Sequence, residues 1–285
     1  MQLTKLVVVR MLFAGCLVMM ALTSHAQSEG SIAGADENPL PKVDDQWRYA
    51  LTLAAWAPAS STSAFLGSAY IGSSNSSVYQ NLQNAGGFAM LTGEAHKDKW
   101  GVMADMVYWQ INDGTTTTKF VTKSTSLYSG TSASTTQTIL TGVGTYTVYN
   151  SPTFYVDALA GIRYISSTTT ASVNTVFTIK VRSVTRTTIA NINASNVDST
   201  ADLVVGFKGR ARIFDSAWYI PFYLDGGKAG GAQTNTWQAL TGIGRAFSWG
   251  DVSLVYRAMY FELNGGDGFN KFSNYGPQLA ATINF

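Results

Sequence analysis

From residue 47 to the C-terminus, the sequence repeatedly places apolar residues at every second position. This period indicates β-strands that have one apolar and one polar face. No apolar run of about 18 residues follows Ala26, so a membrane-embedded form of this chain has to span the bilayer with strands. Ten segments show the period, at residues 47–57, 86–96, 99–112, 134–149, 153–168, 200–214, 216–228, 233–247, 250–264 and 275–285.

The connections between these segments alternate in length. Four are tight, and the others include long polar stretches, of which 58–85 contains a possible short helical turn near 78–82. Outer-membrane barrels have short periplasmic turns and longer outer loops. We therefore predict an all-β chain that forms an antiparallel up-and-down transmembrane β-barrel of about ten strands (eight to twelve), with both termini in the periplasm. The tight connections are 96–99, 150–152, 215–216 and 248–250, and the longer ones are 58–85, 113–133, 169–199 and the Gly/Asn-rich 265–274.

The N-terminus has the features of a secretory signal. Two basic residues precede the apolar stretch 11–22, and the small residues Ser24 and Ala26 form a cleavage site. A lipoprotein signal at Cys16 is the alternative. About 12 apolar residues are too few to cross a membrane as a helix. We expect three parts: a signal peptide at 1–26, a flexible periplasmic lead-in at 27–46 and the barrel at 47–285.

The composition narrows the function. Charged residues make up 13% of the chain, about half the share usual in soluble proteins. The single cysteine lies in the signal, so the mature chain has no thiol for a disulfide, for catalysis or for a metal. Only two of the 19 Lys and Arg lie in the signal, which leaves 17 basic against 17 acidic residues and predicts no nucleic-acid partner. No phosphate loop, zinc spacing or nucleotide motif is present, so we expect no cofactor.

The apolar strand faces favour a membrane barrel over a soluble β-sandwich, which also alternates. The apolar face of 100–108 begins and ends with an aromatic residue, as expected where a strand crosses two membrane interfaces. Two features are less regular. In segment 139–149, either set of alternate residues could face inward. Pro221 predicts a bulge or kink, because it has no N–H to donate to the neighbouring strand.

The last strand carries a second indication of outer-membrane assembly. Tyr275, Leu279, Ile283 and the terminal Phe285 share one face, and such a strand resembles the signal that the barrel-assembly machinery reads. We therefore expect this machinery as a partner, together with outer-membrane lipids and lipopolysaccharide.

Three stretches resemble a proteobacterial family of outer-membrane barrels in the OmpA-type superfamily. They read KWGVMADMVYWQI, TWQALTGIGRAF and VSLVYRAMYFEL, and the resemblance covers 47–58, 99–111 and 236–263. The resemblance implies a small outer-membrane barrel. The family has no settled activity, so it implies no functional residues.

The polar strand faces place charged residues in the predicted lumen. One interpretation is a plug of mutually neutralising ion pairs, because a buried unpaired charge is costly. The alternative is a narrow conduit that Lys208, Arg210 and Arg212 bias toward anions. The predicted lumen charges are Arg48, Glu94, Asp105, Asp157, Arg163, Asp202, Lys208, Arg210, Arg212, Asp225 and Arg257.

An enzyme is the least favoured class. The only histidine after the signal, His96, falls in a tight turn, where we expect it to be solvated, and no other histidine can activate the abundant Ser and Thr. A carboxylate pair among Asp105, Asp157 and Asp225 is the remaining alternative. We expect a structural barrel with a packed polar interior. A porin-like channel is the second hypothesis. Adhesion or ligand binding through Ser/Thr-rich outer loops, which could continue as strands beyond the membrane, is the third.

Overall fold

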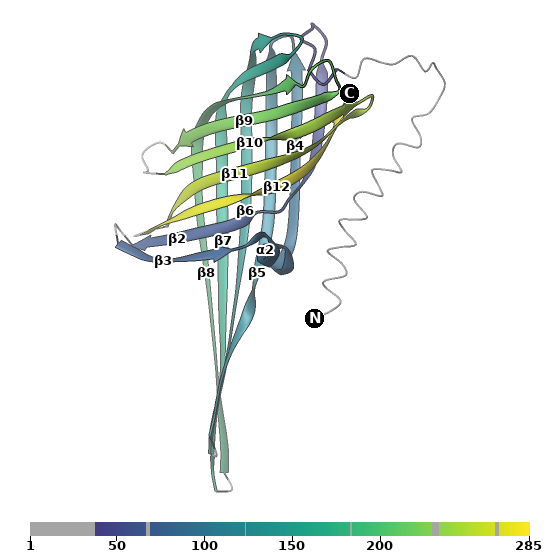
Figure 1. The fold of residues 1–285 in the computed structure, drawn as a ribbon. Helices are drawn as coiled ribbons and strands as arrows, with labels where there is room; N and C mark the ends of the chain where they lie inside the picture. The colour runs from purple at the N-terminus through teal and green to yellow at the C-terminus, as the bar shows by residue number, and fades with distance from the viewer. Residues whose placement is uncertain (1–37, 67–68, 123, 183, 230–233, 266–267) are drawn as a thin grey trace. The chain divides into compact units, whose positions relative to one another are not determined.

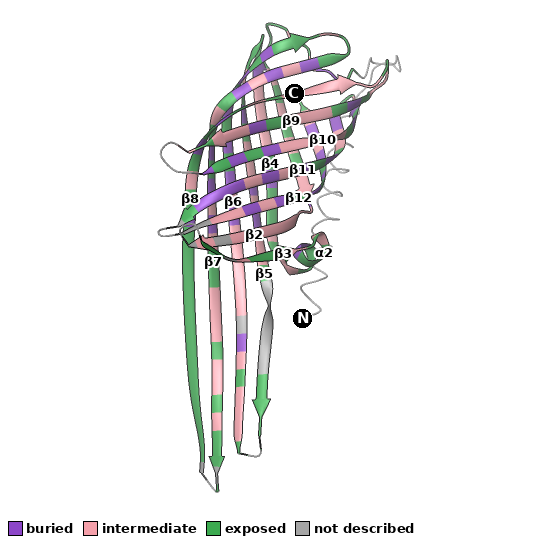
Figure 2. Cartoon of the chain, turned by 60° about the vertical axis from the view of Figure 1, so that its left-hand side comes forward, coloured by how far each residue is buried: buried purple, intermediate pink, exposed green. Residues whose placement is uncertain are grey.

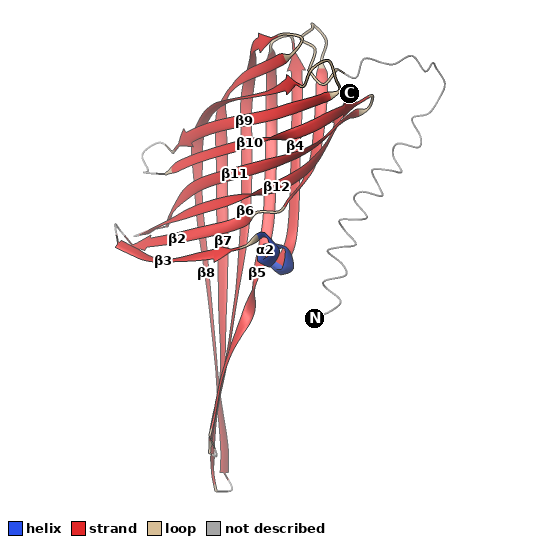
Figure 3. Cartoon of the chain, viewed as in Figure 1, coloured by secondary structure: helices blue, strands red, loops and turns tan. Residues whose placement is uncertain are grey.

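A computed structural model describes residues 38–285 except 67–68, 123, 183, 230–233 and 266–267. The predicted signal peptide lies outside the described residues. Almost all of the described chain is strand, with one short helix (Figure 3). The elements are β1 (Arg48–Trp56), β2 (Ala59–Leu66), β3 (Ala69–Ser76), α2 (Val78–Asn84), β4 (Ala85–Lys97), β5 (Trp100–Val121), β6 (Thr125–Asn150), β7 (Phe154–Val181), β8 (Val184–Arg212), β9 (Trp218–Lys228), β10 (Asn235–Phe247), β11 (Gly250–Gly265) and β12 (Gly268–Asn284).

Ten of these strands form a closed antiparallel ring. Each strand from β4 to β12 pairs with the next, and β1 closes the ring because it pairs with β12 on one side and with β4 on the other. The barrel therefore consists of β1 and β4–β12, which confirms the predicted fold class and the predicted ten strands (Figure 1).

The two ends of the barrel differ. At one end, here called the terminal end, the start of β1 lies beside the end of β12, and the Tyr49 amide donates to the Phe285 carbonyl at 2.8 Å. The turns at this end are tight, and Asp98 and Phe214 adopt left-handed backbone conformations in two of them. At the opposite end, here called the arm end, β5 to β8 continue past the neighbouring strands (Figure 1).

The continuation of β5–β8 forms a four-stranded sheet, here called the arm and defined as residues 112–133 and 170–199. β4 pairs with β5 only as far as Ile111, and β9 pairs with β8 only from Leu203, so both edges of the arm are free. Figure 2 shows few buried residues in it. These segments were predicted as long loops with strand potential, and their Thr, Val and Ile residues, which favour extended backbone, continue the strands.

The segment 58–85, predicted as a long polar loop, is instead ordered into β2, β3 and α2. β2 continues the course of β1 and pairs with β12, with Ala59 opposite Tyr275, and β3 folds back on β2. This strand pair lies outside the closed ring, so the barrel remains ten-stranded.

The helix α2 follows β3 at the predicted helical turn. It begins with a capping box, in which the Ser77 hydroxyl accepts from the Gln80 amide and the Gln80 side chain accepts from the Ser77 amide. Its Asn81 Nδ2 donates to the Pro58 carbonyl at 2.9 Å and to Ser60 Oγ at 3.0 Å, which holds the helix against β2. No helix among the described residues has the length and apolar character needed to cross a bilayer.

Burial alternates from residue to residue along the barrel strands (Figure 2), which indicates that successive side chains face the lumen and the outside in turn. On β5, Trp100 and Val102 are more than half exposed on the outer face, whereas Met103 and Val107 are buried inside. The sequence did not decide which face of β6 is inward. In the structure, Ile139, Thr141 and Val143 face the lumen.

Pro221 interrupts a ladder without a bulge. On β9, Phe222 is opposite Thr241 and Tyr219 is opposite Gly244, so the register with β10 is the same on both sides of the proline. The register therefore contradicts the expected bulge, and the alternative of a kink stays a prediction. The missing N–H removes pairing at 220–221 and leaves the strand alignment unchanged.

Candidate functional site

The lumen contains three successive zones between the terminal end and the arm end. The first is a charged layer near the terminal end, the second is an apolar layer, and the third is a polar cavity near the arm end. The zones follow the inward positions of β5 in order, from Asp105 through Val107 to Trp109 and Ile111.

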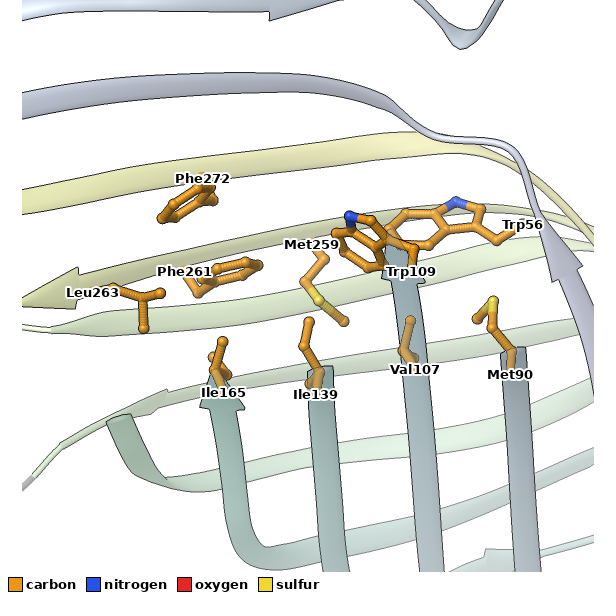
Figure 4. Packing of buried hydrophobic residues seen from close by; sticks show 10 residues of the cluster. All are labelled: Trp56, Met90, Val107, Trp109, Ile139, Ile165, Met259, Phe261, Leu263 and Phe272. Carbon is orange, nitrogen blue, oxygen red and sulfur yellow. The ribbon is translucent and has the colours of Figure 1, made fainter. Parts of the chain in front are cut away.

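The apolar layer consists of ten buried side chains. Met90, Val107, Ile139 and Ile165 come from the consecutive strands β4–β7, and they face residues of β11 and β12 across the lumen (Figure 4). Trp56 packs edge-on to Trp109 at 5.4 Å, and Phe261 stacks on Phe272 at 5.1 Å between ring centroids. The predicted packed polar interior is thus incomplete, because an apolar layer crosses it. The layer comprises Trp56, Met90, Val107, Trp109, Ile139, Ile165, Met259, Phe261, Leu263 and Phe272.

Arg163 and Asp225 form the most buried ion pair of the charged layer. Both side chains have no exposed surface, and the guanidinium donates twice to the carboxylate, with Nη1 to Oδ1 at 2.9 Å and Nη2 to Oδ2. Arg163 also donates to Thr236 at 3.1 Å and to Thr141 at 3.2 Å. Tyr223 donates to the same carboxylate. The pair therefore has the additional hydrogen bonds that a buried ion pair needs.

A second pair joins the charged layer to the apolar layer. Arg257 Nη2 donates to Asp105 at 3.0 Å and to Gln238 Oε1 at 2.9 Å, and its guanidinium lies over the Trp56 ring at 5.5 Å. Arg257 and Asp105, which lie on opposite walls of the barrel, are thereby held against the side of the apolar layer that faces the terminal end.

Lys208 pairs with Glu94, which also contacts His96. His96 Nε2 lies 3.2 Å from Glu94 Oε2, and the His96 ring is buried against Gly101. The expectation of a solvated turn histidine is therefore wrong. β4 continues to Lys97, so His96 is still part of the strand. It occupies one of the inward-facing positions, and its ring lies in the lumen.

The charged layer ends near the terminal end with Arg210, Asp251 and Tyr219. Arg210 Nη2 donates to Asp251 at 2.8 Å, and the Tyr219 hydroxyl donates to the same carboxylate at 2.6 Å. Arg210 also donates to the Pro39 carbonyl at 3.0 Å, and Leu40 is buried. The lead-in predicted over 27–46 is described only from residue 38, and this described part contacts the barrel.

The remaining predicted lumen charges bond mainly to neutral groups. Arg48 donates to the Asp98 carbonyl at 3.5 Å, and Arg212 donates to the Ser216 carbonyl at 2.9 Å, so both lie by the turns of the terminal end. Asp157 accepts from Thr147 at 2.8 Å. Asp202 accepts from Thr200 at 3.1 Å and from Thr234 at 3.4 Å.

Sequence reasoning missed Asp251, although it lies on the same strand phase as Arg257 and could have been found there. Of the three carboxylates proposed for a pair, Asp105 is paired with Arg257 and Asp225 with Arg163, whereas Asp157 accepts from Thr147. Within the described ranges, no group of three His, Cys, Asp or Glu side chains is placed to hold a metal ion.

A cavity of about 380 Å³ lies on the arm side of the apolar layer, here called the cup. It is lined by β2, β3, α2, β5–β8 and β12, and it is partly open. A smaller cavity of about 180 Å³ lies among the ion pairs of the charged layer. The two cavities share no lining residue, so the apolar layer separates them.

The outer face of β12 carries the predicted assembly residues. Tyr275, Leu279 and Phe285 are exposed there, and Ile283 is half-buried. The reading of this face by an assembly machinery stays a prediction.

No protein-family model matches the sequence, and no curated protein is similar to it. Solved structures are similar in fold. The outer membrane protease OmpT from Escherichia coli superposes with a TM-score of 0.50 at 10% identity, over 85% of this chain and 97% of that one. Ail, the attachment invasion locus protein of Yersinia pestis, has a TM-score of 0.35 at 6% identity, over 84% and 99%. A Pseudomonas aeruginosa FadL homologue has a TM-score of 0.29 at 9% identity, over 84% and 90%. The likeness to OmpT shows that the chain has the fold of an outer-membrane β-barrel.

Proposed function

We propose that this protein is a closed outer-membrane barrel that presents a binding surface, made of the cup and the arm, outside the cell. The observation that carries the proposal is the apolar layer across the lumen, with an ion-paired layer on its terminal side and the cup on its arm side. Hydrophobic constrictions prevent the passage of water and ions because they dewet.

The difference between the two ends of the barrel supports an orientation in the outer membrane. The tight turns and both strand termini lie at the terminal end, and barrels of this class keep short turns in the periplasm. The arm, in which polar side chains are mixed with exposed apolar ones such as Ile189 and Ile192, then extends outward from the cell surface. The outward faces of the barrel strands, which carry Val102, Leu203 and Leu254, contact lipid.

Trypsin added to intact cells tests this orientation. Lys119, Lys180, Arg182 and Arg186 are exposed near the tip of the arm. We expect cleavage in the arm of intact cells, with a protected barrel fragment recovered from the outer-membrane fraction. Protection of the arm until the cells are lysed would contradict the proposal. A variant in which these four residues and Lys123, the fifth basic residue of the arm sequence, are replaced with Gln is the control for the site of cleavage.

The tip of the arm supports a second function, the binding of an anionic surface partner. The ranges 114–133 and 170–197 contain five basic residues, the four above and Lys123, and no acidic residue. Clustered cations attract polyanions, and salt screens the attraction. We expect the barrel to bind immobilised lipopolysaccharide at low salt and to bind dephosphorylated lipopolysaccharide much less. Equal binding of both forms, or full binding by the variant in which all five basic residues are replaced with Gln, would contradict this role.

A further inference from the structure

The lining of the cup is polar but almost uncharged. Ser and Thr hydroxyls come from β2, β3, β6 and β7, and carboxamides come from α2, β6, β8 and β12. Among the described lining residues, Asp198 is the only charged one, and it accepts from Asn196 at 2.9 Å and from Asn270 at 3.4 Å. No cation is among the described residues that line the cavity, so its chemistry disfavours an anionic ligand.

Three carboxamides of the cup have a polar atom without a partner among the described residues. Gln137 Oε1, Asn274 Nδ2 and Asn81 Oδ1 are buried atoms that make no hydrogen bond, and their residues are 4%, 2% and 5% exposed. Buried polar atoms are nearly always hydrogen-bonded in folded proteins. All three residues line the cup, from β6, β12 and α2, so a ligand that draws these side chains toward the cavity completes their hydrogen bonding.

The floor of the cup is aromatic. Trp109 and Phe272 line the cavity and also belong to the apolar layer. Their rings are fixed from below, because Trp109 packs against Trp56 and Phe272 stacks on Phe261. The cup therefore offers a rigid apolar surface beneath a ring of hydrogen-bonding groups.

From these features we propose that the cup binds a neutral saccharide of one or two sugar units. A sugar hydroxyl both donates and accepts, so it satisfies the free amide atoms in either orientation of the amide. The C–H face of a sugar ring matches the aromatic floor. The volume of about 380 Å³ lies within the range of about 300–1,000 Å³ that small-ligand sites occupy. A hydrocarbon ligand would leave the amides unsatisfied, and a phosphate would face Asp198.

The proposal rests on the proposed function in one respect, because the cup has to open to the cell surface for the sugar to reach it. The same chemistry is offered by a free sugar and by the end of a neutral glycan chain. Free disaccharides and dextran, used as separate probes, distinguish these two sources.

Titration calorimetry on the refolded barrel tests the site, in lauryldimethylamine oxide because sugar-headed detergents would compete. The probes are maltose, lactose, cellobiose, dextran and the methyl glycosides of glucose, galactose, mannose and N-acetylglucosamine. We expect saturable binding of at least one probe at one site per barrel. We expect glucose 1-phosphate to bind at least about tenfold more weakly than methyl glucoside, because Asp198 faces the cup.

Gln137→Leu is the decisive variant, and Gln110→Leu is its matched control. Gln110 lies at nearly the same height, beside Trp109, but on the outward phase of β5 and with its own partners, Asn112 and Ser134. We expect Gln137→Leu to weaken saccharide binding by about tenfold or more and Gln110→Leu to leave it unchanged. Gln137→Leu should unfold at the same or a higher urea concentration, because it removes an unsatisfied buried atom.

The saccharide site is overturned if the folded barrel binds none of the probes, if Gln137→Leu binds as tightly as Gln110→Leu, or if glucose 1-phosphate binds as tightly as methyl glucoside. These outcomes leave the closed barrel untouched. If the barrel conducts ions and still binds a saccharide, the closed lumen is refuted and the saccharide site is not.

Discussion

Arg163 on β7 and Asp225 on β9 form a doubly hydrogen-bonded ion pair without exposed side-chain surface, and β8 lies between their strands. The pair therefore ties together non-adjacent parts of the barrel wall. Its charges neutralise each other where an ion would otherwise find a fixed charge to bind.

Removal of one member of this pair should destabilise the barrel strongly. Arg163→Met leaves the Asp225 carboxylate buried and unpaired, and the loss of one partner of a buried pair costs about 3–5 kcal/mol. Urea unfolding of the refolded protein, followed by tryptophan fluorescence, measures the change. The double variant Arg163→Met/Asp225→Leu should recover most of the loss, and a double variant as unstable as Arg163→Met would contradict this account.

Gly244 makes room for the Tyr219 ring inside the barrel. A Cβ at Gly244 would lie 2.3 Å from Cζ of Tyr219 and would displace the hydroxyl that donates to Asp251. We expect Gly244→Ala to lower the free energy of unfolding by about 1–3 kcal/mol. Gly142→Ala is the control, because a Cβ there meets no atom within 4 Å. Equal effects of the two substitutions in urea unfolding would argue against this packing.

Phe261 should contribute much of the stability of the apolar layer. Its side chain is fully buried and stacks on Phe272, so Phe261→Ala should cost about 3–5 kcal/mol. Phe207→Ala removes the same group from the outward face of β8, where the ring is 44% exposed, and should cost less. Thermal or urea unfolding compares the two variants, and a larger loss at Phe207 would contradict the inward packing.

The barrel should fold without the arm. Replacement of 113–133 and of 171–194 by Asn-Gly turns shortens two hairpins at paired positions, Asp113 with Ala133 and Ala171 with Ala194. The removed residues add almost nothing to the buried core, so the free energy of unfolding should change by no more than about 1 kcal/mol. Heat-modifiable mobility on a gel reports the folded barrel. Failure of this variant to fold would show that the arm is part of the folding unit.

The period-two pattern was sufficient to predict the ten strands of the ring and the facing of most of them. β5 and β9 show why, because each alternates a consistently apolar face with a mixed one. The pattern failed at 58–85, where short Ser-rich strands carry no clear alternation and depend on pairing with β12.

The zones of the lumen could not be predicted in the same way. The sequence placed Asp105, Val107 and Trp109 on one face, but the residues that meet them across the lumen depend on the stagger of ten strands. Met259 and Phe261, on β11, reach the level of Val107 and Trp109 only through that stagger. The cup is likewise formed from side chains of eight separate elements, including α2.

The central claim is that the lumen is closed, and single-channel recording in a planar bilayer tests it most directly. Purified mature barrel, with its folded state verified by heat-modifiable mobility, is added to the bilayer, and a conducting porin reconstituted in the same way is the positive control. The account predicts no steady conductance steps from the folded barrel. Reproducible steps, with an ion selectivity that changes when Arg210 is replaced with Gln, would contradict closure and establish a conduit through the charged layer.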